Sequence, residues 1–222
     1  MLSLRLGTVF SLIDEGAAVC DVGTDHAHLA IELLKTGKAK KVIASDIAEK
    51  PLLSAKRNIE AANITGVELR LSNGIEALKK GEVDTVVIAG MGGEVIAGIL
   101  ERGLSLLKEG AITLVLQPTT SPEKLREFLC LNGFEIKEEL PVFENGKTYS
   151  VMKSCYKGNC VPKSPAFYYI GKLTPETEAG ALYINKQLTR LSSCMTALEH
   201  IPEKQDEYLE YKAAFDAIKE VI

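Results

Sequence analysis

The sequence contains no apolar run long enough to cross a membrane, which takes about 20 predominantly apolar residues. Its first residues, Met-Leu-Ser-Leu-Arg, lack the basic start and long apolar core of a secretory signal. Hydrophobic residues make up 46 % of the 222 residues and charged residues 25 %, a balance typical of globular proteins. We therefore expect a soluble, cytoplasmic protein with one domain of ordinary size and an appendage.

Disulfide and metal-binding patterns are also missing. The five cysteines are an odd number and form no Cys-x-x-Cys pair, so we expect the reduced thiols of a cytosolic protein. The three histidines do not combine with them into a metal-binding pattern, so no metal is expected. These residues are Cys20, Cys130, Cys155, Cys160, Cys194, His26, His28 and His200.

The glycines of a dinucleotide-binding fingerprint are absent as well. An apolar run over 17–20 predicts a buried parallel strand, Asp21 and Gly23 interrupt the run, and a helical pattern follows. A strand that turns directly into a helix opens a nucleotide-binding α/β fold. Pyrophosphate recognition needs three glycines at this turn, but Asp25 and Ala27 stand where further glycines would lie.

The acidic residues after the first two strands favour a different ligand. The Asp25 carboxylate would lie at a helix N-terminus, where it would repel a phosphate and attract a sulfonium or an amine. The competing interpretation is that Asp25 is only an N-cap residue. Asp46 ends the second predicted strand, 25 residues after Asp21, at the position where a carboxylate binds ribose hydroxyls.

Two later strand ends are followed by polar or glycine-rich loops. Ser72-Asn73-Gly74 follows the third predicted strand and would either contact an adenine ring or form an ordinary turn. Gly90-Met91-Gly92-Gly93 follows the fourth strand, and its glycines permit close backbone approach by a flat or bulky group. The alternative for this second loop is a plain flexible connection.

The order of the predicted elements defines the fold class. A short amphipathic helix over 2–14 precedes five strand–helix units, in which one helix spans 95–107. Asn145-Gly146 then joins two more strands in a hairpin. This layout is an α/β, Rossmann-like class I methyltransferase sheet with five parallel strands and a terminal antiparallel hairpin. The strands are expected over 17–20, 40–46, 67–71, 83–89, 111–116, 134–142 and 148–153.

The C-terminal part of the chain predicts a separate unit. Residues 155–180 contain three prolines and are expected to form a connector with an aromatic patch at 167–169. Apolar residues then recur at helical spacing over 184–198 and 208–222, with Pro202 between them. We expect an antiparallel helical hairpin (coiled coil) with its own apolar seam, removable without unfolding the sheet. The predicted domains are residues 1–158 and 159–222.

Charge is unevenly distributed along the chain. The net charge is −4, but residues 146–200 hold seven basic and three acidic residues and so carry +4. A basic segment attracts an anionic partner locally, within a Debye length of roughly 10 Å. The simpler interpretation is a solvated, lysine-rich face.

These motifs, in this order, resemble those of bacterial tRNA (adenine-N1)-methyltransferases of the TrmK type over nearly the whole chain. They are Asp21-Val-Gly-Thr-Asp-His26, Asp46, Asn73-Gly74, Ala89-Gly-Met-Gly-Gly93, Leu116-Gln-Pro118 and Gly146-Lys-Thr-Tyr-Ser150. The resemblance implies methyl transfer from S-adenosylmethionine to N1 of the adenine at position 22 in the D-arm of tRNA. It also implies that the C-terminal helical hairpin and the basic segment hold the tRNA.

The resemblance implies roles for individual residues. The implied cofactor-binding residues are Asp21, Gly23, Asp25, His26, Asp46, Ile47, Asn73, Gly74 and Gly90. The implied catalytic residues are Asp25, Gly90, Met91 and Gly92. The glycine-rich loop replaces the Asn-Pro-Pro-Tyr type of loop of amino-methylating relatives, which fits a ring-nitrogen target. The expected tRNA contacts are Arg5, Lys157, Lys163, Lys172, Lys186 and Arg190.

Two other functions stay open at this point. The chain could be a class I methyltransferase that acts on another RNA, a small molecule or a protein. It could also be an inactive binding module whose helical hairpin is a protein-interaction arm, although such a module need not retain Asp21, Asp46 and the glycine-rich loop. The expected partners are S-adenosylmethionine and tRNA, with no metal, no membrane and a monomer favoured over a stable oligomer.

Overall fold

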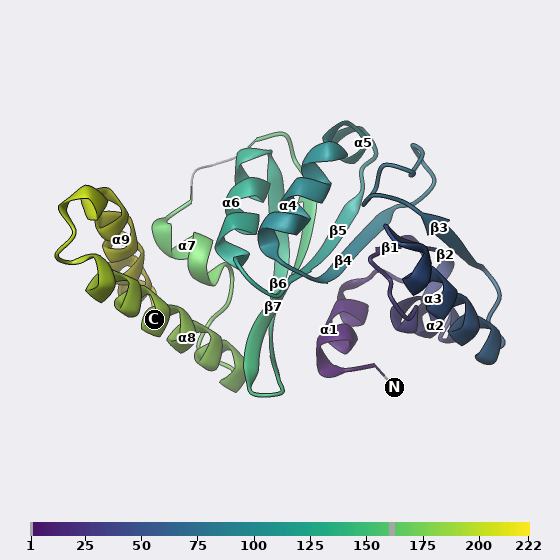
Figure 1. Ribbon diagram of the computed structural model, residues 1–222, viewed down its shortest axis with the longest axis horizontal. Coiled ribbons are helices and arrows are strands. Elements are labelled where there is room, and N and C mark those ends of the chain that lie inside the picture. The colour runs from purple at the N-terminus through teal and green to yellow at the C-terminus, as the bar shows by residue number, and fades with distance from the viewer. Residues whose placement is uncertain (1, 160–162) are drawn as a thin grey trace.

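A seven-stranded sheet forms the centre of the computed structural model, which describes residues 2–159 and 163–222 (Figure 1). The strand order is β3-β2-β1-β4-β5-β7-β6. Neighbouring strands from β3 to β5 are parallel, whereas β7 is antiparallel to both β5 and β6. The predicted fold class is therefore confirmed. The strands are β1 (Ala17–Val22), β2 (Ala39–Asp46), β3 (Val67–Leu71), β4 (Thr85–Met91), β5 (Thr113–Pro118), β6 (Phe134–Glu144) and β7 (Lys147–Tyr156).

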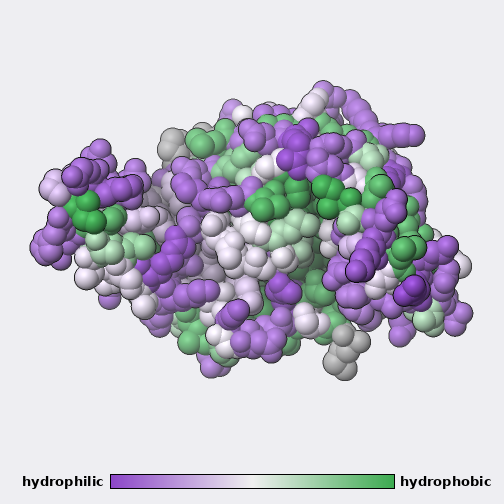
Figure 2. Space-filling model, viewed as in Figure 1, coloured by the Kyte–Doolittle hydropathy of each residue, from purple (hydrophilic) through white to green (hydrophobic). Residues whose placement is uncertain are grey.

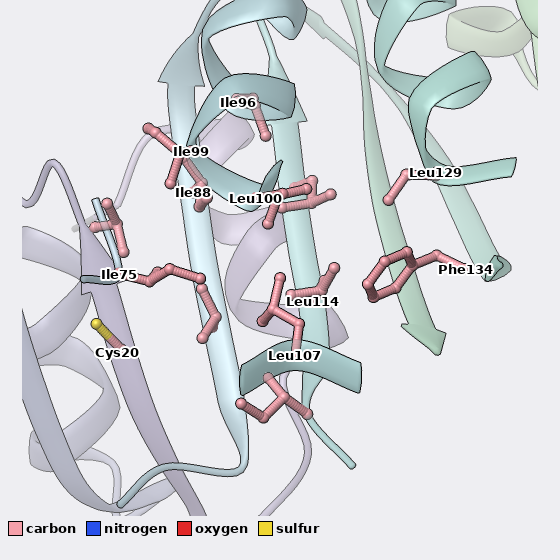
Figure 3. Close-up of a cluster of buried hydrophobic side chains, with 14 of the residues drawn as sticks. Cys20, Ile75, Ile88, Ile96, Ile99, Leu100, Leu107, Leu114, Leu129 and Phe134 are labelled. Carbon is pink, nitrogen blue, oxygen red and sulfur yellow. The ribbon is translucent and has the colours of Figure 1, made fainter. Parts of the chain in front are cut away.

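Helices cover both faces of this sheet, so its central strands are apolar on both sides. All six residues of β1 are buried, and they alternate between two cores, with Cys20 packing on one face and Val19 on the other. Figure 3 shows the first core, in which side chains of the helices after β4 pack on Ile88 and Leu114 of the sheet. The second core lies under the first three helices.

Six helices build these two layers. They are α1 (Leu4–Leu12), α2 (His28–Lys35), α3 (Glu49–Ala61), α4 (Gly93–Arg102), α5 (Leu104–Glu109) and α6 (Pro122–Leu131). The single helix expected over 95–107 is wrong, because the chain breaks between α4 and α5 at Gly103. A Cβ atom at this glycine would lie 2.2 Å from Cδ1 of Ile75, so the break lets the backbone approach the core.

The segment expected to be a connector contains a helix, α7 (Pro165–Ile170). Ser164 caps it by accepting a hydrogen bond from the Phe167 amide, and Pro165 occupies its first turn. The three prolines of segment 155–180 favour an irregular connector, but proline is tolerated at a helix start, so the sequence pattern does not reveal this helix. Of those prolines, Pro162 lies outside the described residues.

Two long helices complete the chain, α8 (Glu178–Leu198) and α9 (Gln205–Val221), joined through a 3-10 turn at Pro202–Lys204. They form an arm at the left of Figure 1. Leu188 and Leu191 of α8 pack on Ala214 and Ile218 of α9, as the apolar spacing predicted. The seam is shared with α7, whose apolar residues belong to the same core.

The expectation that this hairpin is separate from the sheet is wrong for the first half of α8. Tyr183 is 2 % exposed and Gln187 is 3 % exposed, because this half of the helix packs against β6 and β7. The Tyr183 hydroxyl accepts a hydrogen bond from Arg126 of α6 at 3.0 Å. The apolar spacing could not reveal this contact, since the residues that make it are polar.

The expectation that all cysteines are reduced is only partly correct. Cys20, Cys155 and Cys194 are free thiols, but Cys130 is disulfide-bonded, so the expectation of five reduced cysteines is wrong there. Sequence spacing does not report cysteines that the fold brings together, and Cys160 lies outside the described residues. Within residues 2–159 and 163–222, no group of three His, Cys, Asp or Glu side chains could hold a metal ion. No helix in that part of the chain has the length and apolar character of a membrane span.

Candidate active site

A pocket of about 370 Å³ lies where the parallel strands β1, β2 and β4 end. Crevices at the carboxyl ends of such strands, near the point where strand order reverses, are the usual ligand sites of open α/β sheets. Figure 2 shows this face hollowed between α1 and the strands. The lining residues are Arg5, Leu6, Asp21, Gly23, Thr24, Asp25, His26, His28, Leu29, Asp46, Ala89, Gly90 and Met91.

Asp21 is the buried carboxylate of the pocket. It is 6 % exposed, and its Oδ2 accepts a hydrogen bond of 2.7 Å from the Thr24 hydroxyl. Burial raises the pKa of this carboxyl to about 6, and the Thr24 hydrogen bond offsets only part of that rise. A positively charged ligand would favour the ionised form of Asp21 and would gain from its location in a poorly solvated site.

The turn after β1 is fixed to β2 by the main chain. The amides of Gly23 and Thr24 both donate to the carbonyl oxygen of Ser45, at 2.8 and 3.0 Å. Gly23 has φ +73°, and a Cβ atom at this position would lie 2.2 Å from Cε of Met91. Glycine is therefore required here both by the backbone conformation and by the Met91 side chain at the end of the neighbouring strand β4.

Asp25 lies at the mouth of the pocket and does not cap α2. The helix begins only at His28, with Ala27 in the N-cap position, so the N-cap interpretation of Asp25 is wrong. The Asp25 side chain is 67 % exposed, and its Oδ2 lies 3.4 Å from Nε2 of His26. Asp25 and Ala27 both have positive φ, 48° and 57°, a conformation that costs L-residues roughly 1–2 kcal/mol each.

His26 connects this mouth to α3. Its Nδ1 forms a hydrogen bond of 2.8 Å with the Ser54 hydroxyl, and its carbonyl oxygen accepts one from the Asn58 side chain at 2.9 Å. These contacts hold the strained turn in place. Strained backbone of this kind at a pocket is a common feature of ligand-binding turns.

Asp46 is the last residue of β2, which pairs with β1, the strand of Asp21. Asp46 also lines the pocket. One of its carboxylate oxygens accepts a hydrogen bond from the Ala48 amide at 2.9 Å, which leaves the other oxygen available to a ligand hydroxyl. Ile47, the next residue, is 69 % exposed and is not among the residues that line the pocket.

Asn73 and Gly74 lie near the pocket but do not line it. The Ser72 amide donates to the Asp46 carbonyl oxygen at 2.9 Å, which places this turn beside Asp46. The side-chain amide nitrogen of Asn73 donates a hydrogen bond to a carboxylate oxygen of Glu76 at 2.8 Å. Gly74 faces α4, since a Cβ there would lie 2.7 Å from Cγ2 of Ile99. Their adenine-binding role stays a prediction.

The glycine-rich segment at the end of β4 is held by hydrogen bonds, and Gly90 and Met91 belong to the strand itself, which disfavours the flexible-loop interpretation. The Gly90 amide donates to the Gln117 side chain at 3.1 Å, and the Thr119 amide donates to the Met91 carbonyl oxygen at 2.7 Å. Gly90 and Met91 line the pocket, whereas Gly92 does not. A Cβ at Gly92 would lie 2.9 Å from the Thr120 hydroxyl oxygen, so Gly92 lets the loop after β5 approach.

Gln117 belongs to the Leu116-Gln-Pro118 motif, but the sequence did not predict its role beside the pocket. It is fully buried at the end of β5, and its Oε1 accepts hydrogen bonds from both Gly90 and the Arg5 guanidinium, the latter at 3.2 Å. The available signal was a polar amide at the end of an apolar strand. Arg5 is thereby fixed at the edge of the pocket, where its amide also donates to Glu144 at 3.1 Å.

The six expected tRNA contacts do not form one surface. Arg5 lines the pocket at the strand ends. Lys157, Lys163 and Lys172 line a different hollow of about 280 Å³, next to α6 and α7. Because Cys155 of β7 pairs with Thr113 at the start of β5, Lys157 follows β7 at the amino ends of the parallel strands, away from Asp21 and Asp46.

Lys186 and Arg190 belong to a third location, on the side of α8 that faces the sheet. The Arg190 guanidinium forms an ion pair with Glu123 at 2.5 Å, so its charge is already compensated within the protein. Lys186 donates to the Thr148 carbonyl oxygen at 3.2 Å. Thr148 lies at the start of β7, and the register of β7 with β5 places it at the same sheet edge as the pocket.

Comparisons with known proteins agree with this geometry. The model of a family described as "Methyltransferase domain" matches residues 2–152. The tRNA (adenine(22)-N(1))-methyltransferase of Bacillus subtilis is 41 % identical over 152 residues, which are 68 % of this chain and 63 % of that protein. The chain thus aligns with less than two thirds of the length of this relative.

Solved structures extend the likeness to the C-terminal helices. The B. subtilis M1A22 tRNA methyltransferase TrmK has a TM-score of 0.88 at 31 % identity, with 100 % of this chain and 99 % of that chain covered. Streptococcus pneumoniae Sp1610, a putative tRNA (m1A22) methyltransferase crystallised with S-adenosyl-L-methionine, has a TM-score of 0.82 at 34 % identity, covering 97 % of this chain and 100 % of that one.

The fold and the pocket define a Rossmann-like methyltransferase with appended C-terminal helices. More narrowly, the chain belongs to the methyltransferase family that contains the TrmK proteins.

Proposed function

We propose that this protein transfers a methyl group from S-adenosylmethionine to N1 of the adenine at position 22 in the D-arm of tRNA. The observation that carries the proposal is the pocket at the strand ends, which Asp21 and Asp46 line together with Gly90 and Met91 at the end of β4. The chain shares this architecture with TrmK over its whole length. The enzyme would act in the cytoplasm as a monomer.

The residues of the pocket fit this cofactor by their chemistry. S-adenosylmethionine has a sulfonium, an ammonium group and a ribose diol. The buried Asp21 carboxylate provides negative charge for the cationic methionine part. Asp46 provides acceptor oxygens for the diol. Asn73 and Gly74, beside Asp46, are the proposed neighbours of the adenine ring.

When bound, S-adenosylmethionine supplies an electrophilic methyl group. Adenine N1 has an in-plane lone pair and needs no deprotonation, so the protein's task is to orient the base. The N1–methyl bond forms as the methyl–sulfur bond breaks, and the adenine becomes cationic. The end of β4 at Gly90 and Met91, fixed through Gln117, provides a defined wall for the base. Asp25, exposed at the mouth, provides a carboxylate that stabilises the developing positive charge.

The target N1 lies on the Watson–Crick edge, so the base has to leave its pair to enter the pocket. Arg5, at the edge of the pocket, is the proposed first contact for the RNA backbone. The C-terminal unit, taken to begin near residue 159, would hold the tRNA body together with Lys157, Lys163 and Lys172, which share one hollow.

Incubation with methyl-labelled S-adenosylmethionine tests this function and separates it from the two alternatives. We expect labelled tRNA and, apart from the cofactor itself, no labelled protein or small molecule. Label in another fraction would identify a methyltransferase with a different substrate. Cofactor binding without any transfer, measured by calorimetry on the same preparation, would favour an inactive binding module.

A further inference from the structure

A second pocket, of about 210 Å³, lies at the same edge of the sheet as the cofactor pocket. It is formed by the loop from β5 to α6, the start of β7 and the inner side of α8. The lining residues are Pro118, Thr119, Thr120, Ser121, Pro122, Thr148, Tyr149, Ser150, Tyr183, Lys186, Gln187 and Arg190. Figure 1 shows α8 passing beside β6 and β7, which makes this the junction of the arm and the sheet.

Two buried side-chain oxygen atoms of this pocket have no hydrogen-bond partner in the described part of the chain. Thr148 is 7 % exposed and Gln187 is 3 % exposed. The Thr148 hydroxyl oxygen and the Gln187 side-chain carbonyl oxygen form no hydrogen bond with any residue among 2–159 and 163–222. Because nearly all buried polar groups are hydrogen-bonded, such atoms at a pocket indicate a group that they bind.

The charge of the pocket comes from Lys186. Its amine donates to a main-chain oxygen and forms no ion pair with any acid of the described residues. Burial, with the nearby Arg190 and Lys147 charges, lowers its pKa. The Arg190 charge is offset by Glu123. Lys186 is therefore an uncompensated cation at a pocket lined by both polar and apolar groups.

The second pocket shares a wall with the cofactor pocket. The Thr119 amide, in the second pocket, donates to the Met91 carbonyl oxygen, in the first, at 2.7 Å. The Arg5 guanidinium lies 5.5 Å from the centre of the Tyr149 ring, and these two residues line the first and second pockets respectively. If one nucleotide of an RNA chain enters the first pocket, the neighbouring nucleotide of that chain lies close to the second pocket.

We propose that the second pocket binds a nucleotide adjacent in the RNA chain to the methylated adenosine, with its base on Gln187 and Thr148 and its phosphate on Lys186. A simple anion does not match the lining, because the unpartnered Gln187 oxygen needs a donor, such as the amino or ring N–H of a base. The proline rings and Tyr149 supply flat apolar surface for the base. This inference rests on the proposed function, since it requires an RNA substrate.

Isosteric variants separate this role from a structural one. Thr148→Val and Gln187→Met remove the unpartnered polar atoms and leave the volume nearly unchanged. We expect unchanged or higher melting temperatures, because no hydrogen bond is lost in the free protein. We expect tRNA affinity to fall about tenfold, the effect of one lost hydrogen bond with a ligand, and cofactor affinity to be unchanged. A lower melting temperature with normal tRNA affinity would overturn the proposal.

Matched controls lie on the same arm. Thr196→Val and Gln205→Met change exposed residues of α8 and α9 and should leave tRNA affinity within twofold of the wild type. Lys186→Met should weaken tRNA binding and reduce the log–log salt dependence by about one unit, as for one lost phosphate contact. An unchanged salt dependence would show that Lys186 does not contact a phosphate of the tRNA.

Abasic tRNAs test the identity of the ligand by a double-mutant cycle. Transcripts lacking the base at position 21 or at position 23 would be titrated against the wild type and Gln187→Met. We expect the wild type to bind one of the two abasic transcripts about tenfold more weakly than intact tRNA. We expect Gln187→Met to bind that abasic transcript and intact tRNA with equal affinity. Independent effects, or none, would overturn the inference. Methylation of intact tRNA by the wild type tests the proposed function separately, because the cycle is read from binding alone.

Discussion

Arg126 of α6 and Glu139 of β6 form a fully buried ion pair, 2.7 Å between guanidinium nitrogen and carboxylate oxygen, with neither side chain exposed to solvent. The same guanidinium donates to the carbonyl oxygens of Tyr168 and Tyr169 in α7 and to the Tyr183 hydroxyl in α8. One charged group thus joins the sheet to two C-terminal helices. A ligand pocket at the junction of α8 and the sheet depends on this connection.

Glu139→Gln should destabilise the protein by about 3–5 kcal/mol, because it leaves the Arg126 charge buried without its counter-ion. Denaturant unfolding, monitored by circular dichroism, measures the loss. Glu138→Gln, at the exposed neighbouring position of the same strand, is the matched control and should change stability by less than about 0.5 kcal/mol. Equal effects of the two substitutions would contradict the role given to the ion pair.

A chain that ends at Leu182 should be clearly less stable than the full chain. It loses the Tyr183 hydroxyl, which is a partner of Arg126, and it exposes the apolar residues of α7 that pack on α8 and α9. Thermal unfolding of both chains is the measurement. An unchanged melting temperature would mean that the helical hairpin is separable after all.

Asp21→Asn should stabilise the cofactor-free protein at neutral pH. The pKa of Asp21 rises from 3.8 to about 6 on folding, so between these values the folded protein binds more protons than the unfolded one. Stability due to this group is then highest below pH 3.8 and is lost as pH rises through 6, by up to roughly 3 kcal/mol. Asparagine removes this loss and still accepts the Thr24 hydrogen bond.

The comparison of unfolding at pH 4.5 and pH 7.5 tests this sign. The gain from Asp21→Asn should be larger at pH 7.5, whereas Asp206→Asn, an exposed change in α9, should show no such difference. The same Asp21→Asn variant should bind S-adenosylmethionine at least tenfold more weakly, since it loses the negative charge. A variant that is less stable at pH 7.5 and binds normally would contradict both roles of Asp21.

Asp46→Ala should weaken S-adenosylmethionine binding by about 1–3 kcal/mol, the effect of losing hydrogen bonds between a carboxylate and a diol. Calorimetry measures the affinity, and Glu60→Ala on the exposed side of α3 is the control. Because Asp46 also accepts the Ala48 amide, the variant's melting temperature should be measured as well. Unchanged cofactor affinity in a folded variant would remove Asp46 from the site.

The sheet and several residues that line the pocket were predictable because their signals are local. Buried parallel strands are short apolar runs, and Asp21, Asp46 and Gly90 follow or end such runs at one edge of the sheet. The turn at Gly23 was recognisable from a glycine that the backbone requires at φ +73°.

Other features depend on contacts between distant residues, which spacing does not report. Gln117 and Gly90 meet only because β4 and β5 are adjacent. Gly103 breaks a helix because Ile75, from another loop, packs against it. The basic residues of the C-terminal segment look like one set in sequence, yet Lys157 and Lys186 line pockets at different places in the fold.

The central claim is tested most directly by locating the methyl group within a defined tRNA. N1 methylation blocks the Watson–Crick edge, so reverse transcription of a treated, unmodified transcript should stop next to position 22. Nucleoside mass spectrometry should find 1-methyladenosine in the same sample. A transcript with guanosine at position 22 should give neither signal. A methyl group at any other position, or none in a transcript that the protein binds, would contradict the account.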